Sequence, residues 1–111
     1  SLVAERAGAT ASLNAITGPV RDAVGRVPAE GLRGGEETRE RLRTGLDDVA
    51  TAMDMDQYGA AATALGGRVR GQIADSVGEY DGSAADPSRA DLLRLVDRLT
   101  RRLEAIAEGV G

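Results

Sequence analysis

The chain has 111 residues and a formal net charge of −4, which fits one domain with a modest core and argues against a nucleic-acid-binding surface. It contains no His and no Cys, which removes the commonest general base, disulfide bonds and thiolate metal sites. No run of 18 apolar residues occurs, so no membrane-spanning helix is predicted within it.

The first predicted helix covers residues 1–27 and carries an apolar stripe at helical spacing. The stripe consists of Leu2, Ala9, Leu13, Ile16, Val20 and Val27. Arg6 occupies one position of the same stripe, where a charge breaks the pattern. Two interpretations are open: Arg6 lies at a frayed helix end and reaches water, or it faces inward to contact an anion.

Proline and glycine residues divide the chain after this point. Pro19 lacks a backbone donor, so a kink or a break is expected near Thr17, and Pro28 marks the end of the segment. Residues 28–35 contain three glycines and are predicted to form a loop. Their spacing matches neither a P-loop nor a dinucleotide-binding fingerprint, which makes a phosphate site a weak alternative.

The second predicted helix begins near Glu36, and its stripe consists of Leu42, Leu46, Val49 and Met53. Four charged residues near its start are interpreted as a solvent-exposed face or, alternatively, as a small anion-binding patch: Arg39, Glu40, Arg41 and Arg43. Asp54 is predicted to cap the next helix, with Gln57 completing a reciprocal cap. The aspartates around this connection lack the ligand order of a calcium loop, so no metal site is predicted.

The third predicted helix covers residues 55–80. Its stripe consists of Tyr58, Ala62, Leu65, Val69, Ile73, Val77 and Tyr80. It also contains several glycines, each of which costs about 1 kcal/mol relative to Ala within a helix. They are Gly59, Gly66, Gly67, Gly71 and Gly78. We expect close backbone contact with a neighbouring helix to compensate for this cost.

The fourth predicted helix covers residues 86–110 and has the clearest pattern. Its stripe consists of Leu92, Val96, Leu99, Leu103, Ile106 and Val110, widened by Leu93 and Leu95. Asp86 is predicted to cap its start, and Ser88 followed by Asp91 offers a second cap. Asp97 precedes Arg101 by one turn and is expected to pair with it.

Four helical segments with short connections predict an all-α fold, an antiparallel up-down-up-down four-helix bundle, formed by a single domain over residues 1–111. Large aliphatic residues are sparse and Ala is abundant, so the core is expected to be thin. We therefore predict that the chain forms a homodimer through a helix face. No catalytic residue, metal site or cofactor is predicted, because no nucleophile, base or carboxylate pair stands at a recognisable spacing.

The segment Leu2–Thr10 contains a Glu-Arg pair, and it resembles the first helix of helical sensor domains in actinobacterial membrane histidine kinases, the nitrate- and nitrite-sensing type. Residues 46–77 are loosely similar to the same domains, and the resemblance covers less than half of the chain. It implies an extracytoplasmic ligand-sensing or signal-relay domain of a histidine kinase or chemoreceptor, with Arg6 as the ligand-binding residue for a small anion.

The two ends of the chain agree with this interpretation. The chain does not begin with Met, no strong cap precedes Leu2, and acidic residues occupy the last predicted turn, where the helix dipole favours cations. We therefore expect flanking membrane helices beyond both ends, at the extracytoplasmic face of the cell membrane.

A second class remains open: a small secreted helical interaction module of the type associated with type VII secretion. Those proteins carry a Trp-x-Gly turn, whereas this chain has no Trp. They also carry a Tyr-x-x-x-Asp/Glu signal, whereas Tyr80 is followed four residues later by Ala84. An enzyme is the third class, and the absence of His and Cys argues against it.

Overall fold

The computed structural model of the chain describes residues 15–78 and 87–109, and every regular element within them is helical. The first helix covers residues 15–25. It is followed by the 3-10 turn η1 (Ala29–Gly31), α2 (Gly35–Asp54), α3 (Tyr58–Thr63), the π-helix η2 (Ala64–Val69), α4 (Arg70–Ser76) and α5 (Arg89–Ala107). Since α3, η2 and α4 follow one another without a break, the described residues form four helical segments. The predicted all-α class is confirmed.

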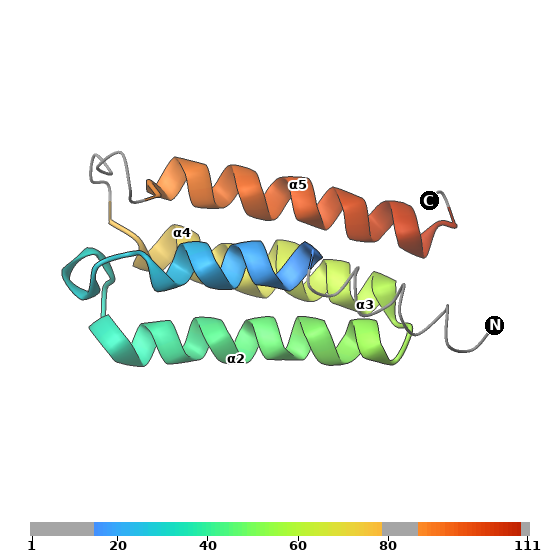
Figure 1. The fold of residues 1–111 in the computed structure, drawn as a ribbon, viewed down its shortest axis with the longest axis horizontal. Coiled ribbons are helices and arrows are strands. Elements are labelled where there is room, and N and C mark those ends of the chain that lie inside the picture. The colour runs from blue at the N-terminus through green and yellow to red at the C-terminus, as the bar shows by residue number, and fades with distance from the viewer. Residues whose placement is uncertain (1–14, 79–86, 110–111) are drawn as a thin grey trace.

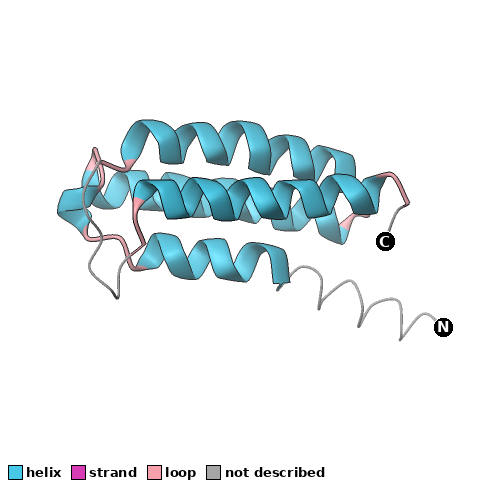
Figure 2. Cartoon of the chain, turned by 90° about the horizontal axis from the view of Figure 1, so that it is seen from above, coloured by secondary structure: helices cyan, strands magenta, loops and turns pink. Residues whose placement is uncertain are grey.

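The four segments lie side by side along the length of the molecule (Figures 1 and 2). The α3–η2–α4 segment packs against α2 on one side and against α5 on the other. The first helix lies beside α5 in both views and is joined to α2 by an ion pair between Arg21 and Asp47. The segment that contains η2 therefore lies between the two longest helices.

The core receives apolar side chains from all four segments, at the positions that the helical spacing predicts. The largest fully buried side chains include Ile16, Val20 and Val24 from the first helix, Leu42, Leu46 and Met53 from α2, Leu65 and Ile73 from the third segment, and Leu92 and Leu103 from α5. Leu99 is 6% exposed, and Leu93 and Leu95 are half-buried against the same core. Most described positions of the predicted stripes are thus buried, whereas Tyr58 and Ile106 are half-buried, and Val24 is buried although the predicted stripe omits it.

The break expected near Thr17 is not found, since residues 15–25 form one uninterrupted helix. Pro19 is exposed, whereas Ile16, Thr17 and Val20 around it are buried. A proline costs the helix one backbone hydrogen bond. Burial of the neighbouring side chains holds the helical conformation against that loss. Arg6 and Asp86 lie outside the described residues.

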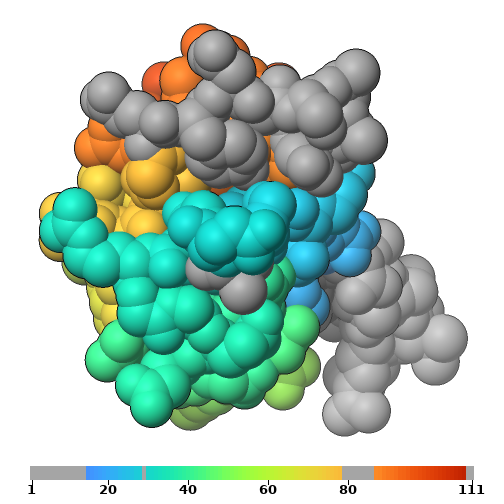
Figure 3. Space-filling model, turned by 90° about the vertical axis from the view of Figure 1, so that its left-hand side faces the viewer, coloured from blue at the N-terminus to red at the C-terminus, as the bar shows by residue number. Residues whose placement is uncertain are grey.

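The loop predicted over residues 28–35 contains η1 and contacts the end of α4. The backbone N–H of Arg33 donates to the carbonyl of Ser76 at 2.7 Å, and that of Gly78 donates to Gly31 at 3.0 Å. These bonds surround an isolated antiparallel bridge between Leu32 and Val77. Figure 3 shows the cyan loop against the yellow end of α4. The loop therefore closes one end of the molecule.

The cap predicted for the third segment is wrong. Asp54 is the last residue of α2, and Gln57 occupies the N-cap position of α3 without a side-chain hydrogen bond. The buried side chain of Met53 keeps α2 helical through this point. The backbone then turns at Asp56, whose φ is 57°, and the Gln57 N–H donates to the carbonyl of Ala52 at 2.8 Å. Backbone bonds replace the expected side-chain cap.

The second cap predicted for α5 is confirmed as a capping box. The N–H of Asp91 donates to Ser88 Oγ at 3.1 Å, and the N–H of Ser88 donates to Asp91 Oδ2 at 3.2 Å. Arg94 Nη2 also donates to the Asp91 carboxylate. Hydrogen bonds from the backbone and side chain of Ser88, followed by that of Arg94, hold the pKa of Asp91 below its ordinary value.

We expect Ser88→Ala to lower the free energy of unfolding by about 1 kcal/mol near neutral pH, because α5 loses its side-chain cap. Because the folded-state pKa of Asp91 is depressed, its contribution is present above the ordinary carboxyl pKa and is lost as the pH falls through the folded value. Urea unfolding of wild type and Asp91→Asn should therefore converge below about pH 4. A stability difference that stays constant well below that pH would contradict this role.

Candidate functional site

A groove of about 660 Å³ runs between the α3–η2 segment and the second half of α5. The side chains on one wall of the groove are small, because the third segment contributes Gly59, Ala62, Gly66 and Gly67. Charged residues line the α5 side and one end: Arg70, Asp97, Arg101, Glu104 and Glu108. Two arginines and three carboxylates give the groove a formal charge of −1. This charge disfavours an anion as its occupant.

The π-helix η2 forms part of one wall of this groove. Single π turns inside α-helices are rare and are frequent at functional sites. Here η2 contains Leu65 and Val69, both fully buried, while Gly66 and Gly67 line the groove. The extra residue in the turn thus keeps the apolar stripe in the core and places two glycines on the wall of the groove.

The glycines of the third segment have different surroundings, so the predicted close contact is confirmed only in part. A Cβ placed on Gly66 would lie 2.7 Å from Thr100 Cγ2 of α5, closer than such atoms approach. Cβ atoms on Gly59, Gly67 and Gly71 would meet nothing within 4 Å. Gly66 therefore allows the close approach of η2 to α5, whereas Gly67 faces open space.

This contrast predicts opposite effects for two adjacent substitutions. Gly67→Ala should raise the free energy of unfolding by about 0.5–1 kcal/mol, because it restricts the unfolded chain without a clash. Gly66→Ala should lower it by about 1–3 kcal/mol, because Thr100 is held by a hydrogen bond from its Oγ1 to the Val96 carbonyl and cannot move freely.

Thr100→Ser provides the control, since it removes Cγ2 and keeps the hydroxyl. We expect Gly66→Ala to cost less in the Thr100→Ser background than in wild type, as measured by urea unfolding in a double-mutant cycle. Equal costs in both backgrounds would show that the methyl contact does not set the helix spacing.

Arg70 and Asp97 join α4 to α5 at one end of the groove. Arg70 Nε donates to Asp97 Oδ1 at 2.7 Å, and Nη2 donates to Oδ2 at 3.5 Å. The hydrogen bond and the charge of Asp97 raise the pKa of Arg70 above its ordinary value. The predicted pairing of Asp97 with Arg101 is therefore wrong, because the carboxylate reaches across to the neighbouring helix. Arg101 has no side-chain hydrogen bond or ion pair to any described residue.

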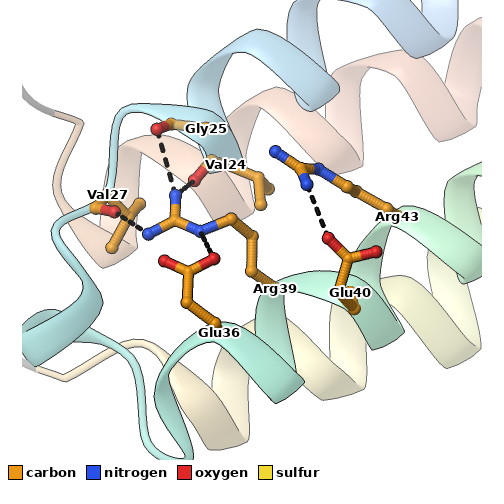
Figure 4. A network of polar contacts seen from close by, with 7 residues as sticks. All are labelled: Val24, Gly25, Val27, Glu36, Arg39, Glu40 and Arg43. Carbon is orange, nitrogen blue, oxygen red and sulfur yellow. Dashed lines mark hydrogen bonds and ion pairs between the residues drawn. The ribbon is translucent and has the colours of Figure 1, made fainter.

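Arg39 is the charged residue whose environment differs most from the prediction. It was expected on a solvent-exposed face, but it is 7% exposed. Its Nη1 donates to the carbonyls of Val24 and Gly25, both at 3.0 Å, and its Nη2 donates to that of Val27 at 2.8 Å (Figure 4). The Val24 carbonyl also accepts from the backbone N–H of Val27 at 3.2 Å, whereas the guanidinium supplies the donor for the carbonyls of Gly25 and Val27 at the end of this segment.

Glu36 accompanies Arg39 on the same turn of α2. Glu36 Oε2 lies 3.2 Å from Arg39 Nε, an ion-pair distance, although the geometry at this buried nitrogen is not that of a hydrogen bond. We treat the contact as Coulombic. Glu40, Arg41 and Arg43 are exposed as predicted, and Arg43 pairs with Glu40 at 2.6 Å. Arg39 therefore has its partners within the chain and leaves no anion-binding patch around it.

The part of the chain that the structure describes was expected to hold no metal site, and its acidic side chains are spread over the surface. No three His, Cys, Asp or Glu side chains among those residues gather closely enough to hold a metal ion. None of the described helices has the length and apolarity that crossing a membrane requires. The predicted anion contact, Arg6, lies outside the described residues, so its surroundings stay a prediction.

Comparison with models of known protein families, with curated proteins and with solved structures finds no match to this chain.

Proposed function

We propose that this chain is an extracytoplasmic ligand-sensing or signal-relay domain of a membrane-anchored bacterial sensor, folded as an up-down-up-down antiparallel four-helix bundle. The arrangement of the first helix and α5 carries the proposal. The two helices are neighbours and run in opposite directions, so the start of one and the end of the other point toward the same end of the molecule (Figures 1 and 2). Two membrane helices flanking such a domain would attach on one side.

This geometry suits the transmission of a signal. Helices are rigid elements that slide against one another by small shear motions. A ligand that contacts both the first helix and α5, and prefers one of their relative positions, would shift the population toward that position. The flanking segments would then move with the helices. A homodimer, expected from the thin core, would place two such helix pairs side by side.

Anion titrations test the sensing function. Nitrate, nitrite, acetate and propionate would each replace chloride at constant ionic strength while the melting temperature is recorded. We expect at least one of them to raise it, because a ligand that binds only the folded state stabilises that state. If none of the anions changes the melting temperature or shifts any amide resonance, the proposal of a small-anion sensor is wrong.

A distance measurement tests the relay. The chain has no Cys, so spin labels can be introduced at two exposed positions, Asp22→Cys in the first helix and Arg102→Cys in α5. We expect the distance distribution between these labels to change when the active anion is added. A control pair at the exposed residues Glu37 and Asp54, both within α2, should give the same distribution with and without anion.

A second candidate, a helical protein-interaction module, is favoured by the groove beside η2. Arg101, Glu104 and Glu108 at this groove are exposed, and their side chains have no hydrogen bond or ion pair to any described residue. A second copy of the chain could pair Arg101 with Glu104 or Glu108 in a self-complementary contact.

Sedimentation measurements over a range of concentrations test this candidate. Gly67→Leu would fill the groove and weaken self-association, whereas Gly71→Leu, outside the groove and equally unobstructed at its Cβ, would not. A wild type that stays monomeric at every concentration would exclude this contact between copies.

A further inference from the structure

A hollow of about 350 Å³ lies between the end of the first helix and the start of α5. We call it the arginine pocket, because its charged lining residues are Arg26, Arg94, Arg98 and Asp91. Three arginines and one aspartate give it a formal charge of +2, on a chain whose net charge is −4. The groove beside η2 has a charge of −1, and a third hollow, lined by Glu30, Arg33 and Asp75, also has −1.

Within the arginine pocket, the acidic residue already has its partners. Asp91 accepts hydrogen bonds from the Ser88 N–H and from Arg94 Nη2, as part of the cap of α5. Arg26 and Arg98 are exposed, and their side chains have no hydrogen bond or ion pair to any described residue. Two guanidinium groups, one just after the end of the first helix and one within α5, are therefore free to receive an anion.

The remainder of the pocket is apolar. Leu95 is half-buried and supplies the apolar surface that a ligand can reach, whereas Ala23, Pro87 and Leu92 are buried. A guanidinium group presents a planar fork of donors that matches a carboxylate with two parallel hydrogen bonds. An apolar wall beside such a fork favours an anion that also has a hydrocarbon part. A bare inorganic ion would leave the exposed part of Leu95 in contact with water.

We propose that the arginine pocket is the ligand site of this domain and that it binds a small organic carboxylate with a short hydrocarbon tail. The inference rests on the proposed sensing function and names its ligand class and its residues. Arg26 directly follows the last residue of the first helix, and Arg98 belongs to α5. A carboxylate held between them would bridge the two helices on which the relay depends, at the end of the molecule opposite to the start of the first helix and the end of α5 (Figure 1).

Propionate is the probe, with chloride as the balancing anion at constant ionic strength. We expect it to bind wild type in calorimetric or amide-shift titrations, and nitrate to bind more weakly because it has no hydrocarbon part. Arg26→Gln and Arg98→Gln should each weaken propionate binding about tenfold or more, because each removes a charge-assisted fork. Arg102→Gln is the matched control, since it removes an exposed arginine on the same helix outside the pocket and should leave the affinity unchanged.

The outcomes separate the site from the function. If propionate binds wild type, Arg26→Gln and Arg98→Gln with equal affinity, the arginine pocket is not the site. The sensing function would then still stand, and loss of binding in Arg6→Gln would assign the anion to Arg6. If neither propionate nor nitrate binds wild type, the pocket and the anion-sensing function are both wrong. Circular dichroism of each variant shows whether its helices remain intact, as expected for exposed positions.

Discussion

Arg39→Ala is expected to lower the free energy of unfolding by about 2–4 kcal/mol, because a buried carbonyl left without its donor costs about 1–3 kcal/mol. Arg39 donates to the carbonyls of Val24, Gly25 and Val27. After the substitution, the carbonyls of Gly25 and Val27 would lose the donor that Arg39 supplies, and buried backbone groups without partners are costly. The contact between the first helix and α2 would also lose a large side chain.

Arg43→Ala is the control on the same helix, one turn later. Arg43 is exposed and pairs with Glu40 within α2, so its loss should cost no more than about 1 kcal/mol. The loss of unfolding free energy for Arg39→Lys should lie between those of Arg43→Ala and Arg39→Ala, or exceed both. A lysine ammonium lacks the planar fork with which Arg39 Nη1 and Nη2 reach their separate carbonyls. Equal losses in urea unfolding for Arg39→Ala and Arg43→Ala would contradict the proposed role of Arg39.

The spacing of residues in the sequence indicated that Arg39 is buried, although the charged residues around it favoured an exposed position. Arg39 precedes Leu42 by three residues and continues the three-four spacing of Leu42, Leu46, Val49 and Met53. It therefore occupies a stripe position, as Arg6 does. The neighbouring charges favoured an exposed face, and no local pattern indicates which carbonyls are left without donors at the end of another helix. That information depends on how the two helices pack.

The π-helix could be predicted from the same kind of spacing. Leu65, Val69, Ile73 and Val77 follow one another at three consecutive spacings of four residues. An α-helix turns by about 100° per residue, so each spacing of four passes a full turn by about 40°. Three such steps would move the last side chain well away from the core. A π turn absorbs an extra residue, which keeps Leu65, Val69, Ile73 and Val77 buried.

The helices and most of the core were predictable because each apolar stripe is a local pattern. The hollows were not, because each is formed by residues from different helices. Arg26 and Arg98 are ordinary charged residues in the sequence, and only the packing of the first helix against α5 brings them to one pocket. In the same way, the pairing of Arg70 with Asp97 replaced the local pair expected within α5.

Leu99→Ala is expected to lower the free energy of unfolding by about 2–5 kcal/mol, through lost transfer energy and the cavity left behind. Leu99 lies in the middle of α5 and is 6% exposed, between the fully buried Val96 and Leu103.

Leu95→Ala on the same helix is the control. It removes the same atoms from a half-buried position, where solvent can enter, so its loss should be smaller. Urea unfolding of both variants compares them directly. A loss below about 1 kcal/mol for Leu99→Ala, the usual range for a surface change, would place this side chain outside the core. It would also mean that α5 packs against the third segment through other residues, and that the groove between these two elements is shaped differently.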